Sequence, residues 1–578
     1  MFGVRNLRGI LWATLAMALF INYITWMRDY PEAPAPAAAS SETPGATASG
    51  GAPSLGSAAP ALSAPAAPVM QAHPAPLATG VAAIPSASAP PMAVGSTLAP
   101  AAPLVRMVTD VLDMQVSLAG GELTRADLLA YPLVKGQPTP VRLLNRDSDE
   151  SLFVLQSGLA GAAGKTMPTH LARYTAPATE LRLAPGQAEL RVPLSWTDGQ
   201  GITVTKTYTL RRGQYAIDLD YQVQNASAAP WEFAPYAQLL RNNEPVVSSY
   251  FHPESYAYKG PAYDDGHKYD KLKMGKDPPT LDVQIDGGWL AAMQHHFVAA
   301  IVPPLGAPWH YQLTTSGNEY LLGATAAPQQ LAPGATATLH QTLYVGPKLQ
   351  ALLEKASPRL YLVTDYGKLS FLARPLFWLL DKVHGLIGNW GWTIMVATLL
   401  LKLMFYPLSE ASMRSMARMK ALQPRIKALQ ETYKDQREQL GKATMELYKR
   451  EKVNPVAGCL PMLIQFPVFI AFYWVLLESV EMRQAPFVGW ISDLSARDPL
   501  FILPVLLAGA NYINFKLNPQ MGDPTQQKMF MIMQLGMPVM FAFMPSGLVL
   551  YWTTNTALSI LQQWNINRRI AAQAKARD

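Results

Sequence analysis

A lysine lies inside a segment whose composition is typical of a membrane-spanning helix. Residues 390–406 are almost entirely apolar, with tryptophans at one end and Tyr406-Pro407 at the other, as at the two interfaces of a bilayer. Lys402 is the charge within this segment. A lysine in hydrocarbon costs roughly 2.5–3.5 kcal/mol on insertion scales, so its amine must face a polar cavity or extend to the nearby interface. The residues of this segment alone leave both alternatives open.

Four more apolar segments follow, 459–477, 500–515, 529–544 and 547–561, and polar side chains recur both in residues 390–406 and among these later segments. Each one could hydrogen-bond a neighbouring helix, a contact worth about 0.6 kcal/mol on average. Together with Lys402 they favour a hydrated interior. As helices, the last three segments would be shorter than the hydrocarbon layer of a bilayer, which is about 30 Å thick. Either the bilayer is thinned around them or the ends of these segments are misplaced. The polar residues are Thr398, Gln465, Asn511, Asn514, Thr553, Thr554, Asn555 and Ser559.

No catalytic site, metal or cofactor is predicted. The single cysteine, Cys459, excludes an internal disulfide and a cysteine-based metal cluster, and no GxxxxGK[ST] loop indicates a nucleotide-driven motor. His295 and His296 adjoin on a predicted strand, so their side chains are expected on opposite faces. A polar loop lacks the ligand spacing of a calcium site and is interpreted as a solvated turn. Its residues are Asp264, Asp265, His267 and Asp270.

The first hundred residues form an anchor and a tether. In residues 1–28, Arg5 and Arg8 precede a long apolar run that ends at Trp26, where a signal peptide would need small residues. We therefore predict an uncleaved transmembrane anchor with a cytoplasmic N-terminus. Residues 29–103 are rich in Ala and Pro and cannot bury enough apolar area to fold, which predicts a disordered linker.

The middle of the chain alternates apolar and polar residues with a period of two. Segments 202–210 and 215–223 are clear examples, and Gly, Pro and Asn turns separate them from similar runs. This pattern predicts an antiparallel β-sandwich over 104–355. Residues 356–385 mix apolar bulk with scattered charges, which favours a helix lying in the membrane interface.

A basic helical hairpin is predicted over 409–455. Apolar residues recur there every three or four positions, first along one helix to Tyr433 and then along a second helix over 436–452. Lysines and arginines cover the other faces, so the positive-inside rule places the hairpin in the cytoplasm. Acidic residues are interleaved with the basic ones, which argues against direct nucleic-acid reading. The net charge of +7 is therefore interpreted as a topology signal.

Counting spans from a cytoplasmic N-terminus gives six helices and a cytoplasmic C-terminus. The anchor is the first span, and residues 386–578 contain the other five together with the hairpin. This fold class, a six-span α-helical membrane protein, places the large β-sandwich outside the cytoplasm.

Five sequence blocks resemble the YidC insertases of Gram-negative bacteria, in the YidC/Oxa superfamily: KVNPVAGCLPMLIQFPVFIAFYWVL, VEMRQAPF, ISDLSARDP, DPTQQKM and MPSGLVLYWTTN. The resemblance implies a non-enzymatic insertase and chaperone of the bacterial inner membrane, with a periplasmic sandwich. It further implies a hydrophilic groove, open to cytoplasm and lipid, that contains a positive charge. That charge falls on Lys402, where the family usually has arginine, so bidentate recognition of a carboxylate is lost.

The resemblance also implies site residues and partners. The implied partners are nascent membrane proteins, the Sec translocon, the ribosome and signal recognition particle pathway, and lipids. Methionines in residues 529–544 offer an adaptable surface for varied clients, although ordinary helix packing explains them equally well. The groove residues are Lys402, Thr398, Gln465, Trp552 and Asn555; the apolar client surface is Met462, Phe466, Phe469, Met533 and Met537; and the basic hairpin residues are Arg414, Arg418, Arg425 and Lys427.

Two other functions compete with this interpretation. A secondary transporter or channel would show internal repeats and several intramembrane charges, and neither is seen in the sequence. A carbohydrate-binding module on a membrane anchor is the other alternative, because the family's periplasmic domain resembles sugar-converting proteins in fold. Fold by itself does not confer that function.

Overall fold

The chain folds into two compact units. The computed structural model describes residues 102–148, 151–162, 165–243, 249, 253–275, 278–433, 436–451, 453, 460–517 and 524–575, so the predicted anchor (1–28) and nearly all of the predicted linker (29–103) lie outside the described residues. One unit contains Tyr366–Leu477 and Met482–Asp578. The other contains the described residues up to Asp365 together with Glu478–Glu481.

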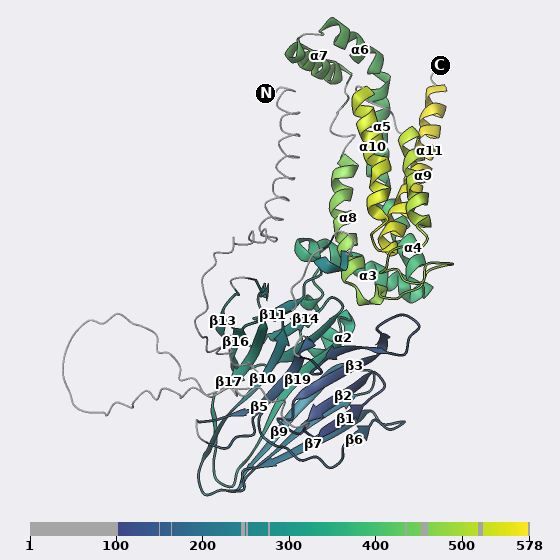
Figure 1. Cartoon of the computed structure of the whole chain (residues 1–578). Helices are drawn as coiled ribbons and strands as arrows, with labels where there is room; N and C mark the ends of the chain where they lie inside the picture. The colour runs from purple at the N-terminus through teal and green to yellow at the C-terminus, as the bar shows by residue number, and fades with distance from the viewer. Residues whose placement is uncertain are drawn as a thin grey trace, which may run out of the picture. The chain divides into compact units, whose positions relative to one another are not determined.

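The second of these units is a β-sandwich, as predicted (Figure 1). Two sheets contribute side chains to one apolar core, and strands such as β8 alternate buried and more exposed residues along their length. Described strand pairs are antiparallel except β1 with β6, which is parallel. The larger sheet follows the order β13 (Leu281–Asp286), β16 (Pro308–Ser316), β17 (Glu319–Ala326), β10 (Trp231–Asn242), β5 (Phe153–Ala160), β3 (Leu123–Pro132), β2 (Leu112–Ser117), β1 (Leu104–Val108) and β6 (Glu180–Arg182), with β4 (Pro140–Leu144) on β3 and β18 (Gln329–Leu331) on β10. The smaller sheet follows the order β12 (Tyr269–Lys271), β11 (Gly260–Asp264), β14 (Trp289–Met293), β15 (Phe297–Val302), β19 (Thr336–Pro347), β9 (Ala216–Asn225), β8 (Ile202–Arg211) and β7 (Glu189–Thr197).

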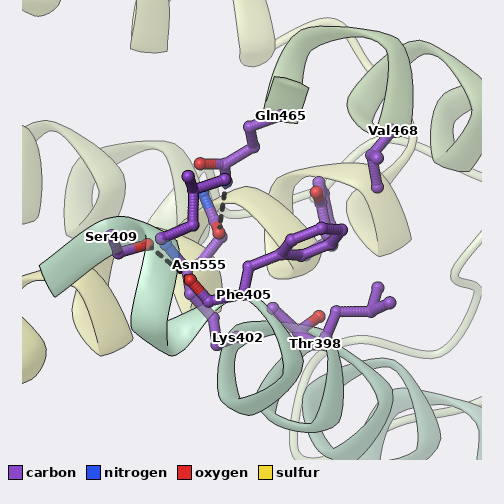
Figure 2. Close-up of a pocket in the computed structure, with 10 residues that line it drawn as sticks. Thr398, Lys402, Phe405, Ser409, Gln465, Val468 and Asn555 are labelled. Carbon is purple, nitrogen blue, oxygen red and sulfur yellow. Dashed lines mark hydrogen bonds between the residues drawn. The ribbon is translucent and has the colours of Figure 1, made fainter. Parts of the chain in front are cut away.

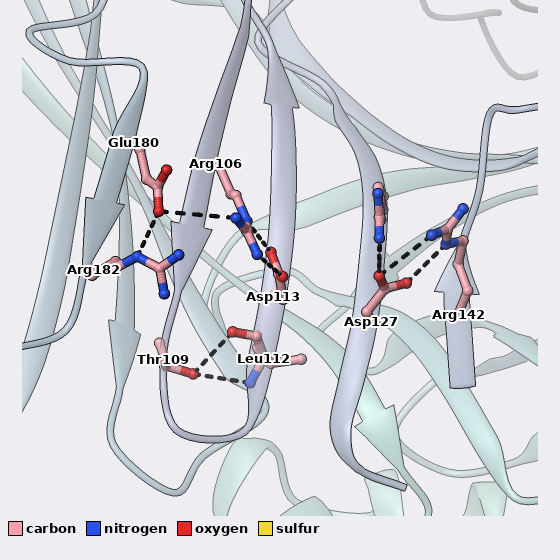
Figure 3. Close-up of polar contacts among 9 residues, drawn as sticks. Arg106, Thr109, Leu112, Asp113, Asp127, Arg142, Glu180 and Arg182 are labelled. Carbon is pink, nitrogen blue, oxygen red and sulfur yellow. Dashed lines mark hydrogen bonds and ion pairs between the residues drawn. The ribbon is translucent and has the colours of Figure 1, made fainter. Parts of the chain in front are cut away.

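Ion pairs between neighbouring strands mark one end of the larger sheet (Figure 3). Arg106 on β1 donates from Nε and Nη2 to the two carboxylate oxygens of Asp113 on β2, at 3.0 and 2.6 Å. Asp127 on β3 accepts from Arg142 on β4 at 2.8 Å. Such pairs fix the register of adjacent strands, although partly exposed pairs add little stability.

Asp264 is buried, so the prediction of a solvated turn is wrong at this position. It ends β11, its side chain is fully buried, and it forms a bidentate ion pair with Arg359, whose Nη2 lies 2.7 Å from Oδ2 and whose Nε lies 3.0 Å from Oδ1. The Arg359 backbone is left-handed, with φ of 67°. Hydrogen bonding to Asp264 raises the pKa of the Arg359 guanidinium further above its usual range.

The expectation for His295 and His296 is also corrected. The two residues lie between β14 and β15, in a hairpin turn and not on a strand, and their rings stack with centroids 3.8 Å apart. The alternation of a strand does not hold in a turn, so the side chains need not face opposite ways. Within the described parts of the chain, no three His, Cys, Asp or Glu residues are grouped so that they could hold a metal ion.

A short connection joins the predicted interfacial helix to the lysine-bearing one. The helix α3 (Ser370–Ile387) ends at Gly388, whose φ of 73° is the left-handed conformation that glycine adopts most easily. Asn389 then begins α4 (Trp390–Met404), because its Oδ1 accepts the N–H of Trp392 at 3.2 Å. The helix predicted over 356–385 corresponds to α3, which begins only at Ser370 and is therefore shorter at its start than predicted. Three short helical elements precede it: α2 (Gln350–Ala356), η4 (Leu360–Val363) and η5 (Gly367–Leu369).

The apolar segment around Lys402 is bent and does not form a straight helix. α4 ends at Met404 and α5 (Tyr406–Ala421) begins two residues later, with a bend of 63° between the two. Among the described residues, no single helix is long and apolar enough to cross a membrane, but this bent pair meets that criterion when taken together. Lys402 lies in the last turn of α4.

In the described part of the predicted hairpin there are three helices in place of two. Its first predicted helix is divided into α5 and α6 (Gln423–Thr432), and α7 (Arg437–Arg450) follows. The break is explained by Pro424 in the first turn of α6, which has no N–H to continue the α5 ladder.

The remaining helices differ from the predicted segments mainly at their ends. Shorter apolar stretches that fall below spanning length are Gln465–Glu478, Ile502–Leu517 and Met531–Phe541. The last helix has 30 residues, about 45 Å, so it continues well past the apolar segment 547–561. These helices are α8 (Leu460–Glu478), η7 (Val480–Met482), α9 (Ile502–Leu517), α10 (Pro524–Phe541) and α11 (Ser546–Lys575).

Candidate functional site

A cavity opens at the bend between α4 and α5 (Figure 2). Residues from α4, α5, α8 and α11 line it, all within the helical unit. Its volume accessible to water is about 40 Å³, enough for about three water molecules. The lining residues are Thr398, Leu401, Lys402, Phe405, Leu408, Ser409, Gln465, Val468, Tyr551 and Asn555.

Lys402 is the one charged side chain among these ten lining residues. Its Nζ donates a hydrogen bond to Oγ of Ser559 on α11, at 2.7 Å. The Ser559 hydroxyl in turn donates to the backbone oxygen of Asn555, also at 2.7 Å. The amine is therefore held by α11, a different helix from its own. A positive charge in a small cavity whose other lining residues are uncharged can attract an anionic group of a passing chain.

Amide groups form the second polar contact across the cavity. Gln465 on α8 donates from Nε2 to Oδ1 of Asn555 at 2.8 Å, which joins α8 to α11 (Figure 2). Thr398 contributes differently, because it is almost fully buried and its hydroxyl donates to the Ile394 carbonyl of its own helix at 2.6 Å. Four of the five predicted groove residues, including Lys402, therefore line one cavity.

The fifth predicted groove residue, Trp552, lies outside the lining. Its ring contacts Phe469 at 4.4 Å and Phe541 at 5.3 Å between centroids, in an aromatic cluster of α8, α10 and α11. The preceding residue, Tyr551, lines the cavity instead. Successive helical residues point about 100° apart, so a one-residue error changes the face that is assigned.

The predicted client surface is divided between exposed and packed side chains. Phe466 is 63% exposed and Met533 is 52% exposed, on α8 and α10. Met537 is partly buried against the helical core, and so is Phe469. The side chain of Met462 lies outside the described residues.

The basic residues of the hairpin lie apart from the cavity lining. Arg414 pairs with Glu410 at 2.5 Å along α5, and Arg425 pairs with Glu451 at 2.6 Å between α6 and the end of α7. Arg418 and Lys427 are exposed. The hairpin therefore presents a charged surface, while part of its charge is neutralised internally.

Ser559 is the contact that sequence reasoning did not assign to the groove. It was recognised only as one of several polar residues in an apolar segment. Asn555 and Ser559 are four residues apart, which places them on one helix face, and that spacing is the signal that could have grouped them. The hydrogen bond between Ser559 and Lys402, which are 157 residues apart, is visible only in the fold.

Comparisons with known proteins agree with this architecture. Residues 104–379 match the family model of the YidC periplasmic domain, and residues 382–574 match that of the 60Kd inner membrane protein. A membrane protein insertase YidC from Thioalkalivibrio sulfidiphilus is 44% identical over 99% of both chains. This chain belongs to the YidC membrane protein insertase family. The YidC of Nitrosococcus oceani is 40% identical over 98% of this chain and 99% of its own.

A solved YidC insertase structure, in an active form with the first transmembrane domain resolved, matches over 80% of this chain and 93% of its own, at 21% identity and a TM-score of 0.35. Membership in the YidC family establishes a membrane protein insertase of the inner membrane with a periplasmic β-sandwich. It is not an enzyme, and its clients are nascent membrane proteins.

Proposed function

We propose that the cavity at Lys402 is the polar site through which this insertase receives the hydrophilic tail of a client. The observation that supports the proposal is that Lys402 lines the cavity while its amine is held by Ser559 of α11, a neighbouring helix. Polar side chains from α4, α5, α8 and α11 line the cavity. A tail that enters such a site crosses less hydrocarbon, in which burying each unsatisfied polar group costs several kcal/mol.

The apolar part of the same client would leave along the exposed side chains of α8 and α10. Phe466 and Met533 are large, apolar and accessible, and a methionine surface adapts to different partners. Burial of the client helix in lipid then supplies the free energy, at about 0.8 kcal/mol per CH₂ group. This groove would open to the cytoplasm and to lipid.

A photo-crosslinking experiment tests the tail pathway. We expect a crosslinker at Val468, which lines the cavity, to capture the tail of a stalled single-span client in reconstituted liposomes. The matched control is Val505 on α9, which is 69% exposed and does not line the cavity, and which should capture lipid in place of the tail. Equal capture of the tail at both valines would contradict the proposed pathway.

We further propose the six-span topology, with both termini in the cytoplasm, and the domain boundaries 1–28, 29–103, 104–355, 356–385 and 386–578. The asymmetric distribution of lysine and arginine supports this arrangement. The exposed basic residues Arg418 and Lys427 would face the cytoplasm, where the ribosome and the signal recognition particle pathway deliver clients. The protein would work alone or with the Sec translocon.

Cysteine labelling checks the topology. In a Cys459→Ser background, Gln436→Cys should react with a membrane-impermeant reagent only from the cytoplasm, and Val488→Cys only from the periplasm. Gln436 is exposed between α6 and α7, and Val488 is 50% exposed after α8, so both sites are reachable. Reversal at either position would exclude the six-span arrangement.

A further inference from the structure

Helix α10 contains a proline that removes one of its own hydrogen bonds. Pro538 lies inside Pro524–Phe541 and has no N–H, so the carbonyl of Gln534, four residues earlier, loses its regular helical partner. In water such a carbonyl would be solvated. In a membrane it needs a donor from the protein, because an unsatisfied backbone group in hydrocarbon costs several kcal/mol.

Asn511 of α9 supplies that donor. Its Nδ2 donates to the Gln534 carbonyl oxygen at 3.1 Å, and the asparagine side chain is buried. Thr556 of α11, also buried, contacts the other end of the same amide, with its hydroxyl 3.5 Å from Asn511 Oδ1. α9 packs beside both α10 and α11 (Figure 1), so one amide connects three helices at the position of the proline.

We propose that Asn511 is a positioning residue that latches α10 to α9 by satisfying the carbonyl which Pro538 leaves without its helical donor. A leucine of similar size would fill the same space but would leave that carbonyl without the amide donor. The latch matters for α10 in particular, because this helix presents several large exposed apolar side chains. These are Ile532, Met533, Leu535, Val539 and Met540.

The consequence for insertion rests on the proposed client surface, whereas the latch itself does not. With the hydrogen bond from the Asn511 side-chain amide in place, α10 holds its exposed side chains at a fixed position beside α9. Without it, the segment around Pro538 opens more often, since local opening follows the loss of hydrogen bonds. Asn511 would thereby keep the apolar surface aligned without touching a client.

A double-mutant cycle with Pro538 tests the latch in the full chain in lipid nanodiscs. Pro538→Ala restores the N–H that can bond the Gln534 carbonyl, so Asn511 should become dispensable in that background. We expect Asn511→Leu to speed hydrogen exchange of the α10 amides after Met537 roughly three- to tenfold, as the loss of one interhelical hydrogen bond would. In the Pro538→Ala background the same substitution should change exchange less than about twofold.

Asn514→Leu, one turn further along α9, is the matched control and should show no dependence on Pro538. An equal effect of Asn511→Leu in both backgrounds would mean that Asn511 acts by packing alone, and the proposal would be overturned. If Asn511→Leu does not fold, the proposal requires that the double variant with Pro538→Ala does fold, and failure of both would overturn it as well.

Insertion by the same variants separates this inference from the proposed function. If the effect of Asn511→Leu on hydrogen exchange depends on Pro538, and insertion is lost with the same dependence, both the latch and the proposed client surface are supported. Coupling in exchange with unchanged insertion supports the latch and removes α10 from the proposed client surface. Absence of coupling removes the latch, whatever the insertion result.

Discussion

Lys402→Glu should abolish most insertion of clients with acidic tails while leaving clients with neutral tails nearly unaffected. The lysine contributes the one charge among the residues that line the cavity, so reversing it turns attraction of a carboxylate into repulsion. At about 4 Å this interaction is worth between ~1 kcal/mol in water and ~4 kcal/mol at an effective dielectric of 20. A tenfold or larger fall in the insertion rate of acidic tails is therefore expected, with a smaller fall for Lys402→Ala and little change for Lys402→Arg.

The measurement is the inserted fraction of paired clients that differ only in tail charge, in liposomes with matched amounts of protein. Lys516→Ala is the control, because that lysine is exposed at the end of α9 and contacts the Tyr512 ring 4.7 Å away. It should not change the ratio of acidic to neutral clients. If Lys402→Ala inserts both kinds of tail equally well, the charge has no part in the mechanism and the lysine only extends toward the interface.

Arg359→Ala should cost the sandwich about 2–3 kcal/mol in its free energy of unfolding. The substitution leaves the Asp264 carboxylate buried without its guanidinium partner, while the Gly266 N–H still donates to its Oδ1 at 2.8 Å. Breaking a fully buried ion pair costs about 3–5 kcal/mol, and the partial exposure of Arg359 reduces that figure. Arginine and alanine meet the same steric cost at a φ of 67°, so the difference reports the ion pair and not backbone strain.

Urea unfolding of the periplasmic fragment 104–365, followed by tryptophan fluorescence, measures this cost. One of its tryptophans, Trp289, pairs with Asp264 across β11 and β14. The matched control is Arg106→Ala, since Arg106 and Asp113 form the same bidentate geometry in a more exposed setting (Figure 3). It should shift the midpoint much less. Adding Asp264→Asn to Arg359→Ala should recover part of the loss, because a neutral amide is less costly to bury. Equal shifts for the two arginine variants would show that burial of Asp264 is not what makes its pair important.

The sequence by itself predicted the architecture, because the relevant signals are local. Alternation with period two predicted the strands of the sandwich, and the block from Asn389 onward predicted the helix that carries Lys402. Family membership followed from contiguous motifs. The sequence also predicted that Lys402, Thr398, Gln465 and Asn555 belong together, and the fold places all four at one cavity.

The errors arose where the fold departs from what a local pattern predicts. Asp264 lies in a polar stretch that predicts solvent exposure, yet Arg359, 95 residues later, pairs with it in the interior. His295 and His296 follow a strand pattern, yet the hairpin turns at those residues and stacks their rings. Trp552 shares a motif with Tyr551, and only the rotation of α11 decides which of the two faces the cavity.

What the sequence determined is therefore the order of the elements, the family and the charge that the cavity contains, since each is set by neighbouring residues. Only the tertiary structure decided that the Lys402 amine ends on Ser559, that the apolar segment bends by 63° next to it, and that Asn511 meets the carbonyl freed by Pro538. The physical reason is the same for the two hydrogen bonds. A hydrogen bond of about 3 Å depends on where two helices cross, and that crossing is set by side chains far apart in the chain.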